Sequence, residues 1–313
     1  MTKVDVAPEM LRWAIKRSGR ERKELEHRFP KLEMWLEGQA QPTLRQLQQF
    51  ASATYTPFGY FFLPAPPEER LPIRDFRTRR AAALRQPSGN LLDTIYLCQQ
   101  RQAWFEEFAR EEGLDPVQLI GSLTRTTPVE EAARKIRQAI PFDLEERRQC
   151  STWEDALRRF VESIEELGIL VMVSGIVGGN PHRKLDSDEF RGFALASSHA
   201  PLIFVNGADT KAAQMFTLAH ELAHLTLGES ALSDVEASVF SDDSAEHWCN
   251  QVAAEVLVPL AVLRQEIQHQ ETWQDAKDRL ARRFKVSTLV ILRRLFEAGV
   301  LQSHSQFLEA YRT

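Results

Sequence analysis

Cysteine is scarce in this sequence, and long hydrophobic runs are absent. Only three of the 313 residues are cysteines, at positions 98, 150 and 249, and none belongs to a C-x-x-C pair. An odd and scattered set of this kind argues against a disulfide framework and against a metal site built from thiolates. The longest apolar stretch, residues 169–177, is far shorter than the roughly 20 residues that cross a bilayer, and the first ten residues lack the apolar core of a secretion signal. We therefore expect a cytoplasmic protein with no membrane partner.

A strong charge of either sign is also missing. The chain has 39 Lys and Arg against 44 Asp and Glu, a formal net charge of −5, and it has no basic tail, low-complexity tract or repeat of fixed period. These absences exclude a solenoid and a protein that coats nucleic acid through charge alone. The remaining composition, 43% hydrophobic and 27% charged residues, is ordinary for compact domains, and the length favours two or three of them.

Residues 1–66 predict a compact module of short helices. Pro8 can open the first helix, and the apolar pattern then predicts helices over residues 20–28 and 30–37. Thr43 is a good N-cap for a fourth helix. Four short helices in about 50 residues form a separate N-terminal unit.

A local basic surplus marks this module, because eight basic residues accompany three acidic ones between positions 12 and 31. The order of the helices, together with Trp35-x-x-Gly38 and the Q-P-T-L sequence of residues 41–44, resembles the Xre/Cro type of helix-turn-helix. In such domains the helix after the turn, here residues 30–37, enters the major groove of DNA. This helix is mostly apolar, so contact with a protein is the competing interpretation. The side chains suited to reading base edges are Lys31, Gln39 and Gln41.

Proline is concentrated after this module. Six of the 15 prolines fall within residues 56–88, and we expect residues 67–90 to form an extended linker. The apolar segment 58–63 should pack along a neighbouring domain rather than stay in water. Helical and strand patterns then follow one another, so the sequence predicts an α+β fold that is mostly α. The predicted helices are residues 91–112, 129–139 and 153–167, and the predicted strands are residues 169–173, 190–195 and 202–205.

Residues 212–227 form the next predicted helix, with Gly228 as its stop signal. This helix contains His220-Glu221-Leu222-Ala223-His224, the H-E-x-x-H pattern. Histidines four residues apart stand on one helix face, about 5–6 Å apart at Cβ, so both can reach one metal ion, for which zinc is the expected choice. Glu221 is turned away by about a quarter turn and is suited to act as a general base. Two ordinary core histidines are the alternative interpretation.

A catalytic zinc site usually has a third protein ligand. On the helix predicted from Ser244, Glu246 shares a face with Asn250, whereas Glu255 points the opposite way. Glu246 is therefore the preferred ligand, and Asn250 could orient a ligand histidine through a hydrogen bond. The alternative for Glu246 is an exposed acid that the helix dipole favours. The downstream carboxylates that compete for this role are Asp234, Glu236, Asp242, Asp243, Glu246 and Glu255.

Two segments resemble the ImmA/IrrE family of zinc metallo-endopeptidases. They are F-T-L-A-H-E-L-A-H at residues 216–224 and E-x-x-C-N-x-V-A-A-x-V-L-V-P at residues 246–259. Residues 191–194 and 201–206 are also similar to the strands that precede the metal helix in that family. The zinc ligands that this resemblance implies are His220, His224 and Glu246.

The resemblance implies a zincin-like domain over residues 91–260, with a small sheet packed on the H-E-x-x-H helix. It also implies an endopeptidase that cleaves a partner protein, often a helix-turn-helix repressor, in stress, phage or mobile-element control. Glu221 would then deprotonate the attacking water. The substrate backbone would pair with the strand at residues 190–195 by β-augmentation. The substrate-binding residues of this strand would be Arg191, Gly192 and Phe193.

The C-terminal segment, residues 261–313, has two interpretations. Its apolar residues recur at helical spacing, which suits either a second helix-turn-helix-like unit or helices that cover the peptidase core. In both cases we expect the intervening arginines to face solvent. These arginines are Arg279, Arg282, Arg283, Arg293 and Arg294.

Other functions fit the same motifs. One is a DNA-binding regulator whose metal site is sensory or structural, and another is an interaction protein of a toxin-antitoxin or defence locus. The separate base in the H-E-x-x-H pattern favours the peptidase, because a structural zinc site needs no base and usually has four protein ligands. The sequence names neither the substrate nor an oxyanion donor. The histidines that qualify as donors by residue type alone are His182, His199 and His247.

Overall fold

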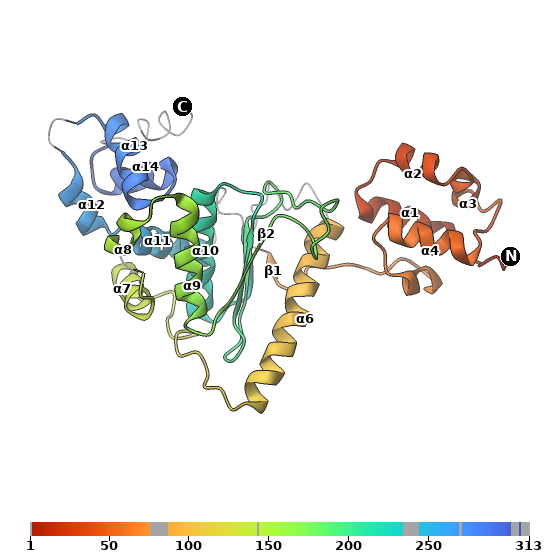
Figure 1. Ribbon diagram of the computed structural model, residues 1–313, viewed down its shortest axis with the longest axis horizontal. Coiled ribbons are helices and arrows are strands. Elements are labelled where there is room, and N and C mark those ends of the chain that lie inside the picture. The colour runs from red at the N-terminus through yellow and green to blue at the C-terminus, as the bar shows by residue number, and fades with distance from the viewer. Residues whose placement is uncertain are drawn as a thin grey trace. The chain divides into compact units, whose positions relative to one another are not determined.

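The computed structural model describes residues 2–75, 87–142, 144–233, 244–268 and 271–301, together with Phe307. The chain forms two compact units, Met1–Pro72 with Arg85–Thr94 and Ile73–Leu84 with Ile95–Thr313. Helices predominate and the strands form one small sheet (Figure 1), which confirms the predicted α+β, mostly α class. The expected linker, residues 67–90, is divided between the two units. No described helix combines the length with the hydrophobicity that a bilayer crossing requires.

The first unit is a set of short helices around an aromatic core. Thr43 caps α4, because its Oγ1 accepts a hydrogen bond from the backbone N of Gln46 and the Gln46 side chain accepts one from the backbone N of Thr43. Phe50 packs edge-on against Trp35 and Phe61 at centroid distances of 6.4 and 5.8 Å. The apolar segment 58–63 packs on the core of the preceding helices through Phe61, as its composition predicts. The elements are α1 (Pro8–Ser18), α2 (Arg22–Arg28), α3 (Leu32–Leu36), α4 (Leu44–Ala53) and η1 (Phe58–Phe62).

The second unit contains a mixed five-stranded sheet in the order β1-β5-β3-β4-β2. The central strand β3 is antiparallel to both of its neighbours, β4 and β5, while β2 pairs with β4 and β1 pairs with β5 in parallel. Both edges of β3 are therefore hydrogen-bonded within the sheet. The strands are β1 (Arg74–Asp75), β2 (Leu170–Ser174), β3 (Gly192–Leu195), β4 (Leu202–Asn206) and β5 (Ala231–Ser233).

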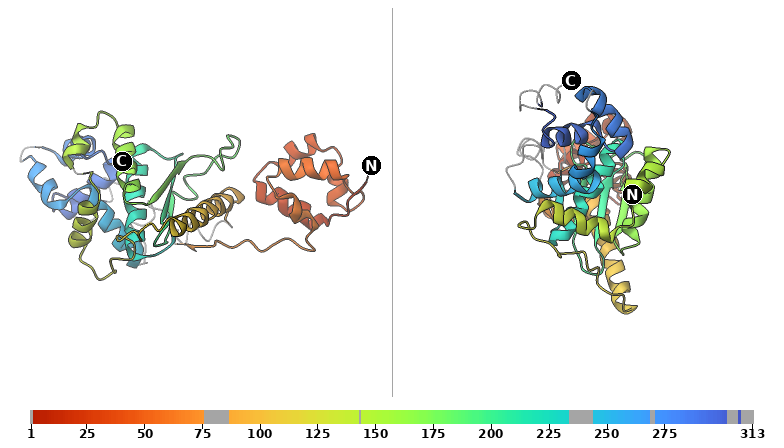
Figure 2. Two further views of the ribbon diagram at one scale, coloured as in Figure 1. Left: turned by 60° about the horizontal axis from the view of Figure 1, so that its bottom comes forward. Right: turned by 90° about the vertical axis from the view of Figure 1, so that its left-hand side faces the viewer.

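Helices cover both faces of this sheet. Figures 1 and 2 show α9 and α10 on one face and α6 on the other. Gln102 of α6 fastens its helix to the sheet region, because its Nε2 donates to the carbonyl oxygens of Leu195 and Ala200 at 2.9 and 2.8 Å. Helix α11 packs on α10 on the side away from the strands. The helices are α6 (Gly89–Glu111), α7 (Val129–Ala139), α8 (Leu144–Gln149), α9 (Trp153–Glu165), α10 (Lys211–Leu227) and α11 (Ser244–Leu257).

The C-terminal helices share one hydrophobic core with α10 and α11. They are α12 (Leu260–Glu266), α13 (Trp273–Phe284) and α14 (Thr288–Glu297). Arg282 is exposed as expected, but Arg294 is buried, with only 4% of its surface exposed, so the expectation that all these arginines face solvent is wrong for it. The reason is an ion pair with the equally buried Glu255 of α11, which joins α14 to the core of the second unit.

Candidate metal centre

Helix α10 carries the H-E-x-x-H residues through the middle of the second unit. Thr210 caps its start by accepting a hydrogen bond from the backbone N of Ala213, and Gly228 ends it in the left-handed region at φ 71°. Every residue from Gln214 to Thr226 is buried, because the helix lies between the sheet and α11. Both histidines of the pattern are thus core residues, and buried imidazoles require polar partners.

Three side chains from two helices converge at this point. The Nε2 atoms of His220 and His224 are 3.1 Å apart, and Glu246 of α11 brings Oε2 to 3.3 Å from the first and Oε1 to 2.9 Å from the second. Ligand atoms about 2.1 Å from a tetrahedral zinc ion stand roughly 3.4 Å from one another. The observed spacings are close to that value. Within the part of the chain that the structure describes, this is the group that could hold a metal ion.

The protonation states of these side chains suit metal binding. Burial alone would raise the pKa of Glu246, but the charge of His220 and the hydrogen bonds with His220 and His224 outweigh it and lower the pKa to about 2. Burial, assisted by His220, lowers the pKa of His224 despite the opposing effect of Glu246. At neutral pH the site therefore has an ionised carboxylate and a neutral His224 imidazole, the forms in which these groups bind metals.

Glu221 lies beside this group but does not join it. Its side chain is completely buried, and neither carboxylate oxygen has a hydrogen-bond partner among the described residues. Burial and the charge of Glu246 raise the pKa of Glu221 well above its usual value, and the hydroxyl of Ser233 on β5, which is near but outside hydrogen-bonding geometry, opposes that rise. A buried carboxylate with open lone pairs and a raised pKa is suited to accept a proton at neutral pH.

Gly192 at the start of β3 makes room for Glu221. A Cβ atom at this position would stand 2.5 Å from Cγ2 of Thr217, 2.9 Å from the carbonyl oxygen of Phe204 and 3.1 Å from Oε1 of Glu221. The first two distances are shorter than a Cβ atom tolerates and the third is tight, so glycine is the residue that fits against this part of α10. The structure thus gives Gly192 a packing role next to the site.

The expected pairing of a substrate with the strand at Arg191, Gly192 and Phe193 is contradicted by the sheet order. The outer edge of β3 is occupied by β5, with Gly192 opposite Ser233 and Phe193 opposite Leu232. Phe193 is fully buried, and Arg191 forms an ion pair with Asp209 at 3.0 Å. The sequence pattern could not reveal this, because β5 has only three residues and lies about 40 residues further along the chain.

The expected hydrogen bond between Asn250 and a ligand histidine is not formed among the described residues. Nδ1 of His220 and both amide atoms of Asn250 are buried, and none of them has a hydrogen-bond partner within the described ranges. Asn250 instead lines a cavity one helical turn beyond Glu246. Glu255 faces away from the site and pairs with Arg294, as the helical spacing predicts. The remaining carboxylate candidates, Asp234, Glu236, Asp242 and Asp243, lie outside the described residues.

Other residues near the centre carry no sequence signal of their own. Ser233 on β5 lowers the pKa of Glu221, and Glu229, just after α10, raises the pKa of His224. Glu229 also forms an ion pair with Arg125 at 2.5 Å. Ser233 and Glu229 come from short segments without periodicity, so only the folded chain reveals them. The histidines considered as oxyanion donors are elsewhere on the surface: His182 and His247 are exposed, and His199 is half-buried beside Ser198.

In the first unit, the three side chains proposed to read DNA differ in availability. Lys31 and Gln39 are exposed. Gln41, in contrast, uses its amide within the unit: Oε1 accepts a hydrogen bond from the backbone N of Val6 at 3.1 Å, and Nε2 donates to Oδ1 of Asp5 at 2.9 Å. Gln41 is therefore not available to a base edge in this conformation.

The electrostatics of the first unit do not favour a nucleic-acid surface. Helix α3, the expected recognition helix, has only five residues, and its exposed side includes Glu33, with Glu37 just beyond its end. Phosphates would be repelled by these carboxylates. Four of the eight basic residues of this segment are engaged in ion pairs with acids, namely Arg12, Arg17, Arg20 and Arg22.

Comparison with known families agrees with the geometry of the second unit. Residues 164–296 match the family model described as the IrrE N-terminal-like domain, peptidase family M78. The matched segment begins at the end of α9 and reaches the end of α14, so it includes α10, α11 and the C-terminal helices. A comparison with curated protein sequences gives no match. Residues 164–296, which contain His220, His224 and Glu246, therefore form a domain similar to the IrrE N-terminal-like domain and of the metallopeptidase type.

Proposed function

We propose that the protein is a zinc-dependent endopeptidase that cleaves a partner protein. The observation that carries this proposal is the convergence of His220, His224 and Glu246 beside the unpartnered carboxylate of Glu221. Three protein ligands leave a coordination position open, as in catalytic zinc sites, whereas structural zinc sites usually have four. The family match supports the same reaction class.

The two imidazoles and the carboxylate of Glu246 would hold the zinc ion. When bound, such an ion supplies Lewis-acid chemistry: it polarises a peptide carbonyl and lowers the pKa of a water molecule. Glu221 would take a proton on one carboxylate oxygen as the water oxygen attacks the carbonyl carbon. It would then give this proton to the amide nitrogen as the C–N bond breaks, so that a free amine and a carboxylate result. The raised pKa of Glu221 suits both transfers.

Access to the site is closed in this conformation. His220, Glu221 and His224 have no exposed surface and Glu246 is 1% exposed, so an extended peptide cannot reach them until a covering part of the chain moves. We therefore expect cleavage to depend on an opening event, such as the binding of a partner. The same burial is the observation that favours the alternative, a regulator in which the metal site is sensory or structural.

The proposed substrate is a transcriptional repressor of the helix-turn-helix type, cleaved in stress, phage or mobile-element regulation. The first unit would recruit this partner through protein contacts. Its short α3 helix with Glu33 at the exposed side, and the engaged amide of Gln41, support protein contact over DNA reading. Binding of DNA by the unit would instead support the regulator, and a steep dependence on salt would identify it.

The test is direct cleavage. Zinc-loaded protein is incubated with the repressor-like products of neighbouring genes, and the products are identified by mass spectrometry. Glu221→Gln keeps the shape of the site but cannot accept the proton, so we expect it to bind zinc and to lose at least about 100-fold in rate. A Glu221→Gln protein as active as wild type would refute the role of Glu221. Zinc-loaded wild type that cleaves none of these proteins would refute the proposed substrate class.

A further inference from the structure

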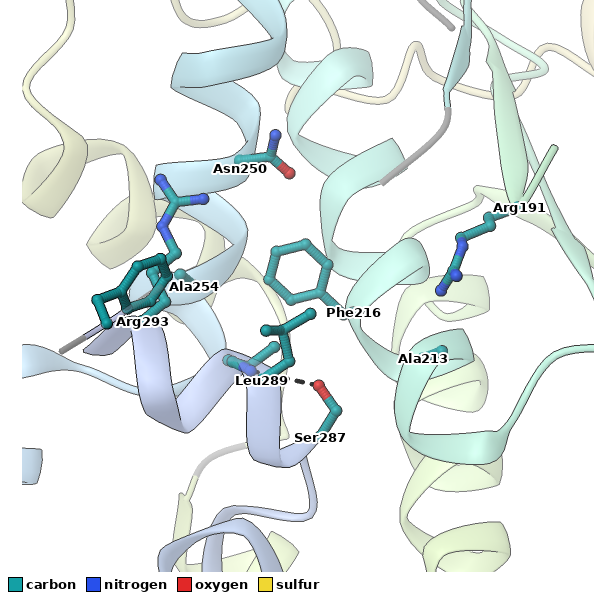
Figure 3. Close-up of a pocket in the computed structure, with 10 residues that line it drawn as sticks. Arg191, Ala213, Phe216, Asn250, Ala254, Ser287, Leu289 and Arg293 are labelled. Atoms are coloured by element: carbon teal, nitrogen blue, oxygen red, sulfur yellow. Dashed lines mark hydrogen bonds between the residues drawn. The ribbon is translucent and has the colours of Figure 1, made fainter. Parts of the chain in front are cut away.

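A small cavity lies between α10, α11 and α14, next to the metal centre. Its walls are mostly apolar, and its volume is about 60 Å³. Figure 3 shows the ring of Phe216, from α10, between Asn250 of α11 and Leu289 of α14. The apolar walls come from Ala213, Phe216, Ala254, Leu289 and Val290.

The helical spacing puts this cavity beside the ligands. Phe216 precedes His220 by four residues on α10, and Asn250 follows Glu246 by four residues on α11. Four residues are one turn, a rise of about 6 Å. A side chain in the cavity would therefore belong to a residue next to, or one removed from, the peptide bond at the metal centre.

Asn250 contributes a buried amide to the wall of the cavity. Its side chain is 1% exposed, and neither its amide nitrogen nor its amide oxygen has a hydrogen-bond partner in the described part of the chain. Leaving both atoms unpaired in the core is costly, so a native side chain of this kind calls for a partner. One donor and one acceptor side by side match the backbone C=O and N–H of a peptide.

Charge does not select the occupant. The two arginines at the cavity are neutralised, because Arg191 pairs with Asp209 at 3.0 Å and Arg293 pairs with Glu297 at 3.1 Å. One water molecule needs roughly 10–15 Å³, so the cavity has room for about four heavy atoms. A branched aliphatic side chain has this size, whereas an aromatic ring is too large for the walls as they stand.

We propose that this cavity is the specificity pocket of the peptidase and takes a leucine-sized aliphatic side chain of the substrate, while Asn250 binds the substrate backbone. The inference rests on the proposed peptidase function. It also gives the C-terminal helices a part in substrate choice, because Leu289 and Val290 of α14 form one wall.

The first test uses a peptide library in which each residue around the cleavage site is varied. Wild type should cleave peptides with Leu, Ile or Met at one fixed position at least about tenfold faster than peptides with Asp, Lys or Gly there. Leu289→Ala enlarges the pocket and should shift the preference at that position toward Phe and Trp. Leu260→Ala, a matched change at a half-buried leucine outside the cavity, should leave the preference unchanged.

The second test uses Asn250→Ala. This change removes an amide with two unpaired atoms, so the melting temperature should stay the same or rise, while kcat/KM falls about tenfold or more and the zinc content is unchanged. Ala254→Val, which narrows the pocket, should favour smaller side chains and serves as a second check if one variant does not fold.

The outcomes separate the two proposals. Cleavage without any side-chain preference, or with a preference that Leu289→Ala does not change, would overturn the pocket and leave the peptidase intact. An Asn250→Ala protein with unchanged kcat/KM would overturn the role of Asn250. No cleavage of any library peptide by the zinc-loaded protein, either alone or with a repressor-like partner present to open the site, would overturn the peptidase function and the pocket with it.

Discussion

Gly192 on β3 lies directly against Glu221 on α10, and a Cβ atom at Gly192 would stand 3.1 Å from Oε1 of Glu221. The same atom would come within 2.5 Å of the Thr217 side chain. The sheet and the metal helix can therefore approach this closely only with glycine at this position. The sequence resemblance marked Gly192 as a substrate-binding residue, and the structure places it in tight packing against the part of α10 that carries Glu221.

Replacing Gly192 with alanine should therefore damage both stability and activity. We expect Gly192→Ala to lower the free energy of unfolding by about 2 kcal/mol, because the extra methyl group overpacks the contact with Thr217. Displacement of Glu221 should lower the cleavage rate by at least about tenfold. Gly59→Ala is the matched control, since no atom lies within 4 Å of its added Cβ. Equal stability and activity of both variants would contradict this packing role.

Glu246 should be essential for metal affinity. Glu246→Gln removes the anionic ligand, and we expect zinc binding to weaken by at least about 100-fold, more than the loss of an outer hydrogen bond causes. Competition with a chromophoric chelator measures the change. Glu229→Gln is the control, because Glu229 lies near His224 but pairs with Arg125 and is not one of the converging ligands. If both variants bind zinc like wild type, Glu246 is not a ligand.

The buried ion pair between Arg294 and Glu255 should make the C-terminal helices necessary for the stability of the second unit. Arg294→Met leaves the Glu255 carboxylate buried without its cation and should cost about 3–5 kcal/mol in chemical denaturation. Arg282→Met at the exposed face of α13 should change stability by less than about 0.5 kcal/mol. The double change of Arg294 and Glu255 to methionine should recover most of the loss. A small effect of Arg294→Met alone would mean that α14 contributes little to the core.

The three cysteines report whether buried parts of the second unit open, and Cys249 on α11 reports on the packing next to Glu246. All three are buried, and burial raises the pKa of Cys98 to about 12 and raises the pKa of Cys249 as well, with Glu246 and Glu221 adding to the second rise. At pH 8 only about one Cys98 in 10⁴ is a thiolate, and this fraction grows as pH rises. A thiol reagent at pH 8 should therefore find less than one reactive thiol in the native protein and three in the denatured protein. Rapid labelling of Cys249 without denaturant would contradict the tight α10–α11 packing.

Local helical spacing explains why the metal centre could be predicted. His220 and His224 share a face because they are four residues apart, and Glu246 lies on the side of α11 opposite Glu255, where it meets them. A helix fixes these directions from neighbouring residues alone. The sequence therefore contains the information for this part of the site.

Contacts between segments that are distant in the sequence explain why the predictions for β3, Arg294 and Asn250 were wrong. The edge of β3 is covered by a three-residue strand, Ala231–Ser233, which is too short to show an alternating pattern. Arg294 is buried because its partner Glu255 lies 39 residues earlier in the chain. Asn250 faces a cavity whose third wall comes from α14. Pairing of this kind depends on tertiary packing, which periodicity does not encode.

The central claim is that His220, His224 and Glu246 hold one zinc ion. Anomalous diffraction from crystals of the zinc-loaded protein, measured on both sides of the zinc absorption edge, tests it most directly. We expect one peak per chain, about 2.0–2.2 Å from the Nε2 atoms of both histidines and from an oxygen of Glu246. No peak between these three side chains, or a zinc ion bound by other residues with Glu246 out of range, would contradict the account.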